Sequence, residues 1–144
     1  LHFLLRPLPL VEAFGKKLVN LGKNMEVISR SRIEVEAMRL MVLRAAQAMD
    51  TLGNAEARVW VSAVKAMVPE KCCDIINEAI QMHGAAGVSQ WFPLTDMWHS
   101  QRTLRLADGP DEVHHMVVGR AEVRNREAER TSGDATSHTL GGPV

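Results

Sequence analysis

A carboxylate lies at a turn between two helical-looking segments, in the run RLADGPDEVHH that covers residues 105–115. The Gly-Pro pair that follows Asp108 breaks a helix, and acidic residues directly after a proline are typical of the start of the next helix. These roles account for the neighbours of Asp108 and leave Asp108 itself unassigned. Its carboxylate either caps the following helix, as aspartate often does, or is held at the turn to act as a base.

Other residues near this turn that could carry chemistry are less well placed. Asp111 and His115 share a helix face, and together with Asp108 they imitate part of a metal site, but no further histidine accompanies them. His114 and His115 point about a quarter-turn apart and cannot face one ligand. His83 lies on an apolar face, which favours a place in the core or at a helix end. We therefore predict no metal site.

The composition excludes several classes of function. Among 144 residues, 17 basic and 17 acidic side chains cancel, which gives no electrostatic case for binding nucleic acid or an anionic membrane. Cys72 and Cys73 are adjacent, a spacing that rarely forms a disulfide, and two thiols fall short of a closed zinc site. A reducing compartment fits them best. No apolar run approaches the length of a membrane span, and the apolar start, broken by two prolines, lacks the features of a targeting signal.

Apolar periodicity predicts the helices that must position Asp108. Over residues 22–52 an apolar residue recurs every seven positions, which is typical of one face of a helix in a bundle. A stop and a turn follow at residues 50–54. A second helix is expected over residues 55–83, with Pro69 kinking or briefly interrupting it. The two series of the first helix are Ile28, Val35, Val42 and Met49, and, three residues on, Met38, Ala45 and Leu52.

Two more helices follow in the predicted order. Residues 84–87 end the second helix, a shorter helix covers residues 93–106, and the last helix begins near Pro110 and becomes polar all round in AEVRNREAER. The scarcity of apolar residues predicts disorder over residues 131–144. No segment alternates as a strand would, so we predict an all-α fold, an up-down helical bundle. The side chains expected inside it are Ile28, Val35, Val42, Val59, Ala63, Ile76 and Ile80.

The segment from Ala79 to Arg120 resembles the C-terminal helical domain of flavin-dependent acyl-CoA dehydrogenases. That family has a Gln-x-x-Gly-Gly-x-Gly turn, then a helix with a proline, then an acid-Gly turn that opens the last helix. The first of these is met here by Gln81, Gly84, Ala85 and Gly87. The run Leu-Ala-Asp-Gly-Pro-Asp-Glu-Val is similar in particular to acyl-CoA dehydrogenase family members ten and eleven.

The upstream half of the chain resembles the same domain. SRIEVEAMRLMVLRAAQAMDTLG is similar to the family's long helix, and Phe14 begins a Phe-Gly-Lys run like the one that precedes that helix. The resemblance therefore assigns residues 13–130 to the C-terminal helical domain and leaves residues 1–12 as a stretch outside the family.

The resemblance implies a role for Asp108. These enzymes remove an α proton from an acyl-CoA thioester while the β carbon passes a hydride to FAD, as in fatty-acid β-oxidation. The family's base is the acid directly before the turn glycine, which is Asp108 here, and Gly109 would let the substrate thioester approach the backbone. Family members usually carry Glu at this position. Aspartate is one methylene shorter, but the subgroup that this chain resembles also carries Asp.

The resemblance also implies the cofactor contacts. In the family, the Gln and the first two glycines of the turn, here Gln81, Gly84 and Ala85, meet the FAD of a partner subunit. Phe14 is placed near the cofactor in the same way. The three residues after the acid-Gly pair lie near the flavin, and backbone contact is expected there because two of them are acidic: they are Pro110, Asp111 and Glu112.

The N-terminal stretch departs from the family. The position of a family arginine that reaches the partner's FAD is Val11 here, and LHFLLRPLPLVE has no counterpart. An alternative start or an incomplete chain is therefore expected. Since the family places a helical and a β-barrel domain upstream, we expect this chain by itself to bind FAD weakly or not at all and to be inactive.

The resemblance further implies partners and a location. Acyl-CoA is the expected substrate, self-association as a homodimer or tetramer is expected, and a second flavoprotein is a possible electron acceptor. Family members are mitochondrial or peroxisomal. A function of a different class stays open: a non-catalytic helical assembly module made from the same fold.

Overall fold

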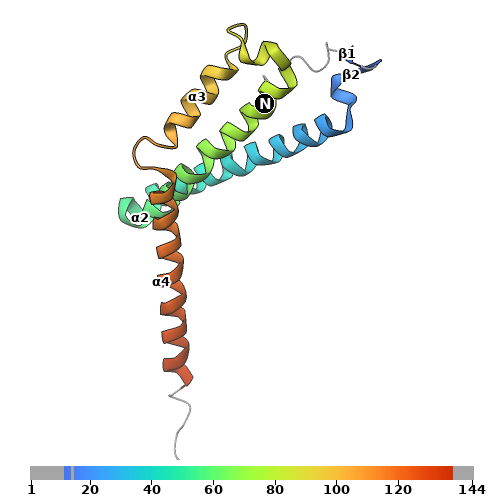
Figure 1. Cartoon of the computed structure of the whole chain (residues 1–144). Helices are drawn as coiled ribbons and strands as arrows, with labels where there is room; N and C mark the ends of the chain where they lie inside the picture. The colour runs from blue at the N-terminus through green and yellow to red at the C-terminus, as the bar shows by residue number, and fades with distance from the viewer. Residues whose placement is uncertain (1–11, 14, 138–144) are drawn as a thin grey trace, which may run out of the picture.

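The fold is built on one long helical hairpin. The computed structural model describes residues 12–13 and 15–137, and most of them lie in three α-helices. Helix α2 spans Gly22–His83, but Gly53 within it has φ 78° and ψ 175°, a conformation open essentially only to glycine. The chain reverses there, so the first half of α2, residues 22–52, runs antiparallel to its second half, residues 54–83 (Figure 1).

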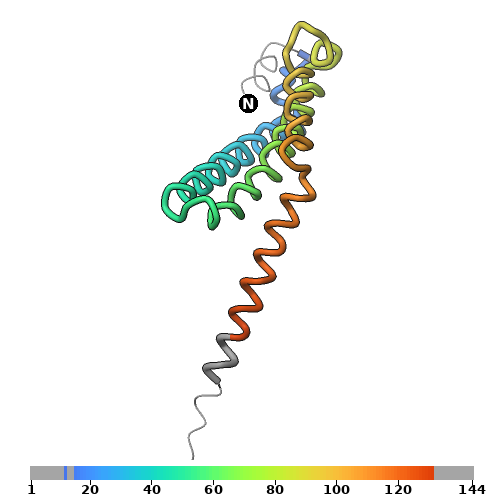
Figure 2. The backbone as a smooth tube through the Cα atoms, turned by 90° about the vertical axis from the view of Figure 1, so that its left-hand side faces the viewer, coloured from blue at the N-terminus to red at the C-terminus, as the bar shows by residue number. Residues whose placement is uncertain are grey.

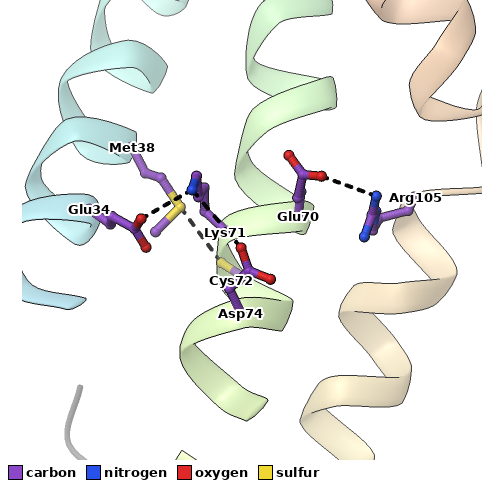
Figure 3. Close-up of polar contacts among 7 residues, drawn as sticks. All are labelled: Glu34, Met38, Glu70, Lys71, Cys72, Asp74 and Arg105. Carbon is purple, nitrogen blue, oxygen red and sulfur yellow. Dashed lines mark hydrogen bonds and ion pairs between the residues drawn. The ribbon is translucent and has the colours of Figure 1, made fainter. Parts of the chain in front are cut away.

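Small side chains let the two halves of α2 pack closely near the reversal. The buried residues there are Ala45, Ala48, Ala57, Ser62 and Ala66. Farther from the reversal, polar and sulfur contacts join the halves (Figure 3). Lys71 Nζ lies 3.1 Å from Glu34 Oε1, and Cys72 Sγ lies 3.9 Å from Met38 Sδ.

The hydrophobic core lies at the open end of the hairpin, where α3 covers it. The 3-10 helix η2 (Gly84–Val88) leads from α2 to α3 (Leu94–Leu104). Leu94 is 1% exposed and forms the core with Val27, Ile76 and Ala79. Phe92 and Trp98, both half-buried, pack against this cluster. Helix α3 is thereby fixed along the hairpin by the side chains at its start.

Helix α4 (Asp111–Ser137) leads away from the rest of the molecule (Figures 1 and 2). Asp111 and Ala121 are its buried residues among those whose side chains are described, and residues 122–131 are exposed. Arg126 pairs along the helix with Glu122 at 3.0 Å and with Glu129 at 3.3 Å. The projecting part of α4 is therefore a solvated helix.

A short ribbon precedes the hairpin. Strands β1 (Glu12–Ala13) and β2 (Lys16–Lys17) pair antiparallel, with Glu12 opposite Lys17. The 3-10 helix η1 (Leu18–Asn20) then leads into α2. The sequence pattern did not predict this ribbon, because two-residue strands are too short to show alternation.

The all-α fold class and the order of the helices are confirmed. The predicted stop at residues 50–54 coincides with Gly53, and the predicted start near Pro110 coincides with the start of α4 at Asp111. Pro69, in contrast, does not interrupt α2, since Gly53 is the residue with non-helical angles within it. No helix in the described part of the chain has the length and apolarity to cross a membrane.

One predicted core residue was wrong. Val42 is 43% exposed, whereas Met38 and Ala45 of the companion series are each only 7% exposed. A helix of 3.6 residues per turn lets a strict seven-residue series drift around its axis, so the sequence contained two neighbouring apolar faces. Packing against the second half of α2 buries Met38 and Ala45, while Leu52, the last member of the companion series, stays 54% exposed beside the reversal. Of the other predicted core residues, Ile76 is buried and the remainder are half-buried: Ile28, Val35, Val59, Ala63 and Ile80.

The predicted start of the disordered tail also differs from the structure. Residues 131–137 belong to α4, which continues to Ser137. Extending a helix adds one hydrogen bond for each residue ordered, so an established helix continues through residues that would not start one. Residues 138–144 lie outside the described part of the chain.

Candidate active site

The turn that carries Asp108 joins α3 to α4 through two successive residues with positive φ. Asp108 has φ 55° and Gly109 has φ 102°. Asp108 is the one non-glycine residue with positive φ in the described chain; aspartate tolerates this region better than most residues. A Cβ atom on Gly109 would lie 3.0 Å from Nε2 of His114. Position 109 therefore requires glycine both for its φ and for the contact with His114.

Side chains from α2 and α4 hold the backbone of this turn. Lys65, in the second half of α2, donates from Nζ to the carbonyl of Leu104 and to that of Gly109, the latter at 3.1 Å. On the α4 side, Nε2 of His114 lies 3.2 Å from the carbonyl oxygen of Asp108. A carbonyl can only accept, so this contact requires the proton on Nε2. The carbonyls of both Asp108 and Gly109 are thus anchored.

A pair of ion contacts fixes the two ends of the turn to α2. Arg105 Nε lies 2.5 Å from Asp111 Oδ2, and Arg105 Nη2 lies 3.3 Å from Glu70 Oε1; Figure 3 shows the contact with Glu70. The hydrogen bond to Asp111 raises the pKa of Arg105, which keeps the guanidinium charged. Asp111 is 8% exposed, so this is a charge-assisted contact in a nearly buried setting.

The carboxylate of Asp108 itself is left free. It is exposed, and no other described residue forms a hydrogen bond or ion pair with it. The first turn of α4 is closed instead by the carbonyl of Pro110, which accepts from the N–H groups of Val113 and His114. Asp108 therefore does not cap α4 with its side chain. The anchored turn thus presents the Asp108 carboxylate without a partner among the described residues.

Gln81, Gly84 and Ala85 lie where α2 passes into η2, ahead of α3, whereas Asp108 follows α3. Figure 1 shows that α4 starts at the end of α3 opposite to the connection with α2. Helix α3 has 11 residues, which corresponds to about 16 Å at 1.5 Å per residue. All three residues are exposed, and no protein atom lies within 4 Å of the place where a Cβ on Gly84 would be. The structure therefore does not bring this set together with Asp108.

The turn at residues 84–88 combines an exposed part with a packed part. Gly87 is buried, and a Cβ there would lie 2.5 Å from the carbonyl oxygen of Ile80, so this glycine serves packing. Ala85 has no positive φ and fits a position where the family has glycine. Beside it, Gln81 and Gly84 line an open, mostly apolar groove together with Leu18, Leu21, Met82 and Phe92.

The remaining predicted site residues differ in their surroundings. Pro110 and Glu112 are exposed, and Phe14 lies outside the described residues. Oδ2 of Asp111 is engaged by Arg105, while Oδ1 is buried without a hydrogen-bond partner among the described residues. The backbone contact of Asp111 with the cofactor stays a prediction. His83 lies at a helix end, as predicted. Its ring meets the Phe92 ring edge to face, with 4.6 Å between the ring centroids. Among the described residues, no cluster of three or more His, Cys, Asp or Glu could hold a metal ion.

Sequence reasoning missed Lys65 and Glu70, which anchor the turn from α2. Lys65 is separated from its two acceptors by 39 and 44 residues, and Glu70 is 35 residues from Arg105. No local spacing links residues so far apart. The one signal available was the position of both on the helix expected to pack beside the turn.

Comparisons with known proteins agree with this architecture. Residues 10–123 match the model of the family described as acyl-CoA dehydrogenase, C-terminal domain. The chain is 48% identical over 115 residues to acyl-CoA dehydrogenase family member 11 of Rattus norvegicus, covering 80% of this chain and 15% of that protein. It is 46% identical over 114 residues to family member 10 of Mus musculus, covering 79% of this chain and 11% of that protein. The resemblance to members ten and eleven is thereby confirmed.

A solved structure extends the agreement to three dimensions. The chain superposes on a structure described as that of an acyl-CoA dehydrogenase from Mycobacterium abscessus with a TM-score of 0.85 and 46% identity. The match covers 87% of this chain and 31% of that one. The chain thus spans less than a third of the length of each of these relatives.

Proposed function

The chain belongs to the acyl-CoA dehydrogenase family, whose C-terminal helical domain it carries, and on this premise we propose that it supplies the catalytic base and part of the flavin site of an FAD-dependent acyl-CoA dehydrogenase. The reaction would be the α,β-dehydrogenation of an acyl-CoA thioester. Two features of the chain support the proposal: the free carboxylate at the α3–α4 turn and the exposed Gln-Gly segment at the far end of α3.

The free carboxylate of Asp108 is the observation that carries the proposal. Lys65 and His114 anchor the carbonyls of Gly109 and Asp108, and the Arg105–Asp111 pair joins the two ends of the turn. Keeping a residue that has a Cβ in a left-handed conformation costs of the order of 1 kcal/mol in free energy. A strained, well-anchored turn whose carboxylate has no partner within the described chain is better suited to chemistry than to capping.

Asp108 would take the α proton. A carboxylate oxygen of Asp108 would accept the proton, and the electron pair of the broken C–H bond would enter the new C=C bond. Bound FAD would supply the acceptor for the hydride that leaves the β carbon. Proton abstraction of this kind requires a carboxylate screened from water. Asp108 is exposed in this chain. The substrate and the parts of the enzyme that cover the turn would therefore provide the apolar surroundings.

The turn also suits aspartate at this position. Positive φ is several-fold more frequent for aspartate than for most residues with a Cβ, because its short polar side chain is better tolerated there. The left-handed conformation of Asp108 thus gives a local reason for Asp where the family usually has Glu. Gly109 follows with its own positive φ and adds no side chain beside the carboxylate.

Gln81, Gly84 and Ala85 would contact FAD of a partner subunit. They are exposed, and the apolar groove beside Gln81 and Gly84 offers a surface for a flat heterocycle, with the Gln81 amide as a polar group at its edge. Since these residues are separated from Asp108 by the length of α3, they would serve a different flavin from the one at Asp108. This arrangement requires self-association.

The first prediction tests Asp108 directly. In a complete acyl-CoA dehydrogenase that carries this chain as its C-terminal domain, Asp108→Asn should keep FAD bound and abolish flavin reduction by acyl-CoA. Asparagine tolerates positive φ and keeps the shape of the side chain, but it cannot take up the proton as a carboxylate does. Anaerobic stopped-flow bleaching of the flavin measures the effect.

The matched control is Asp50→Asn, which changes an exposed aspartate beside the hairpin reversal and should bleach normally. Bleaching at the wild-type rate in Asp108→Asn would rule out Asp108 as the base and favour a non-catalytic assembly module. The chain by itself should bind FAD weakly or not at all, because Gln81, Gly84 and Ala85 are exposed and form only part of a flavin site. It should leave acyl-CoA unoxidised, because Asp108 is exposed as well.

A further inference from the structure

We propose that Lys65 is a positioning residue for Asp108, an inference that rests on the function proposed above. Lys65 lies in the second half of α2, far from the turn in sequence, and its ammonium group bridges two carbonyls. One is the carbonyl of Leu104, the last residue of α3, and the other is that of Gly109, the residue after Asp108. The ammonium thereby ties both sides of the turn to one point on α2.

The bridge answers two physical needs of the turn. The last carbonyls of a helix have no partner within it, and lysine is suited to bind them because it also interacts favourably with the helix dipole. The Gly109 carbonyl directly follows two residues of positive φ, whose conformation has to be held by contacts from outside. One ammonium group with three donors satisfies both carbonyls and so sets the distance between the end of α3 and the peptide that carries Asp108.

The other anchors of the turn cannot replace this bridge. His114 belongs to α4, and among the described backbone groups its ring hydrogen-bonds the carbonyl of Asp108, not that of Gly109. Arg105 and Asp111 connect the first turn residue to the start of α4, and Glu70 holds Arg105 to α2. Lys65 alone among these joins α2 to the residue directly after Asp108. Its loss should leave the fold in place and let the carboxylate move.

The test uses Lys65→Met in a complete dehydrogenase that carries this chain. Methionine is unbranched and a good helix former but has no donor. Misplacement of a catalytic group by about 1 Å costs on the order of a hundredfold in rate, so we expect flavin reduction at saturating acyl-CoA to slow by roughly ten- to a hundredfold. FAD content, melting temperature and KM should stay close to those of the wild type. Lys65→Gln, a polar replacement too short to reach both carbonyls, should show the same loss and serves if the methionine variant does not fold.

A matched control separates positioning from general stability. Lys71→Met removes another lysine of α2 that pairs with Glu34 on the opposite side of the hairpin, and it should reduce flavin at the wild-type rate. In an enzyme that already carries Asp108→Asn, adding Lys65→Met should not slow the exchange of the substrate α proton into D2O any further. Lys65 acts through the Asp108 carboxylate, which that enzyme lacks. An independent, additive loss would overturn the proposal.

The outcomes distinguish this inference from the proposed function. If Asp108→Asn abolishes reduction and a folded Lys65→Met or Lys65→Gln enzyme reduces its flavin at the wild-type rate, Lys65 has no positioning role and Asp108 remains the base. If Asp108→Asn reduces its flavin normally, both the base and its positioning residue are overturned. A loss in Lys65→Met that matches a loss of FAD, with the same loss in Lys71→Met, would assign Lys65 to general stability.

Discussion

At the scale of single residues, the turn between α3 and α4 shows how backbone and side chain divide their roles. Asp108 and Gly109 adopt positive φ, and Lys65 and His114 anchor their carbonyls. The strain and the anchoring concern the backbone, while the Asp108 carboxylate remains exposed. The turn therefore depends on Gly109 even though that residue carries no functional group.

Gly109→Ala should destabilise the chain by about 1–2 kcal/mol. The added Cβ meets an unfavourable φ of 102° and would lie 3.0 Å from His114 Nε2. Urea denaturation of this chain measures the change. Gly119→Ala is the control, because nothing lies within 4 Å of its Cβ position in α4, and it should stabilise the helix by roughly 0.5–1 kcal/mol. Equal effects of both substitutions would show that the turn is not strained as described.

At the scale of elements, the hairpin of α2 is the framework on which the turn is mounted. Its second half supplies Lys65 and Glu70, which hold the turn. Its first half packs against that second half. Cys72 and Cys73 lie in the second half, where Cys72 contacts Met38 of the first half. The state of these thiols therefore reports whether the hairpin is closed.

Both thiols should react slowly with an alkylating reagent at pH 7 until the hairpin opens. Burial raises the pKa of Cys72 and of Cys73, so the folded hairpin keeps them protonated. In the unfolded chain both thiols ionise near pH 8.5. Above that pH only the unfolded state releases the thiol protons, so the free energy of unfolding should fall as the pH rises further. Mass spectrometry of protein labelled with and without urea tests the slow reaction of the thiols. Rapid labelling without urea would contradict the closed hairpin.

A double Cys72→Ala, Cys73→Ala variant should lose the pH dependence of unfolding in this range.

At the scale of the whole molecule, an apolar stripe on the first half of α2 is left uncovered. Ile33, Leu40 and Leu43 are 65%, 66% and 55% exposed. Ile33 and Leu40 are seven residues apart and Leu43 follows three residues later, so the three share one side of the helix. Contiguous exposed apolar surface of this kind marks an interaction site. A second copy of the chain fits the self-association that the flavin contacts proposed for Gln81 and Gly84 would require.

Leu40→Glu should therefore weaken self-association by at least tenfold in dissociation constant, since it places a charge in an apolar contact, and tenfold corresponds to about 1.4 kcal/mol. Sedimentation equilibrium of this chain measures it. Leu106→Glu is the control, because Leu106 is also 60% exposed but lies at the α3–α4 turn. A wild-type chain that is strictly monomeric at high concentration, or equal weakening by both substitutions, would contradict an interface on this stripe.

The sequence by itself determined where the hairpin reverses, where α4 begins and which residue stands at the turn. Gly53 and the Gly109–Pro110 pair act through their own φ and their immediate neighbours, so their effects could be predicted from a few adjacent residues. The role expected of Asp108 followed from resemblance to the family, and the structure leaves its carboxylate without a partner among the described residues.

Only the tertiary structure decided which helix face is buried and what holds the turn. Met38 and Ala45 are buried in place of Val42 because the close approach of the two halves of α2, set by small side chains, selected one of two apolar faces. Lys65 contacts Gly109 across 44 residues of sequence because α2 and α3 lie side by side. Periodicity shows that a helix has an apolar face, but the packing angle and axial position of its partner decide which long-range contacts form.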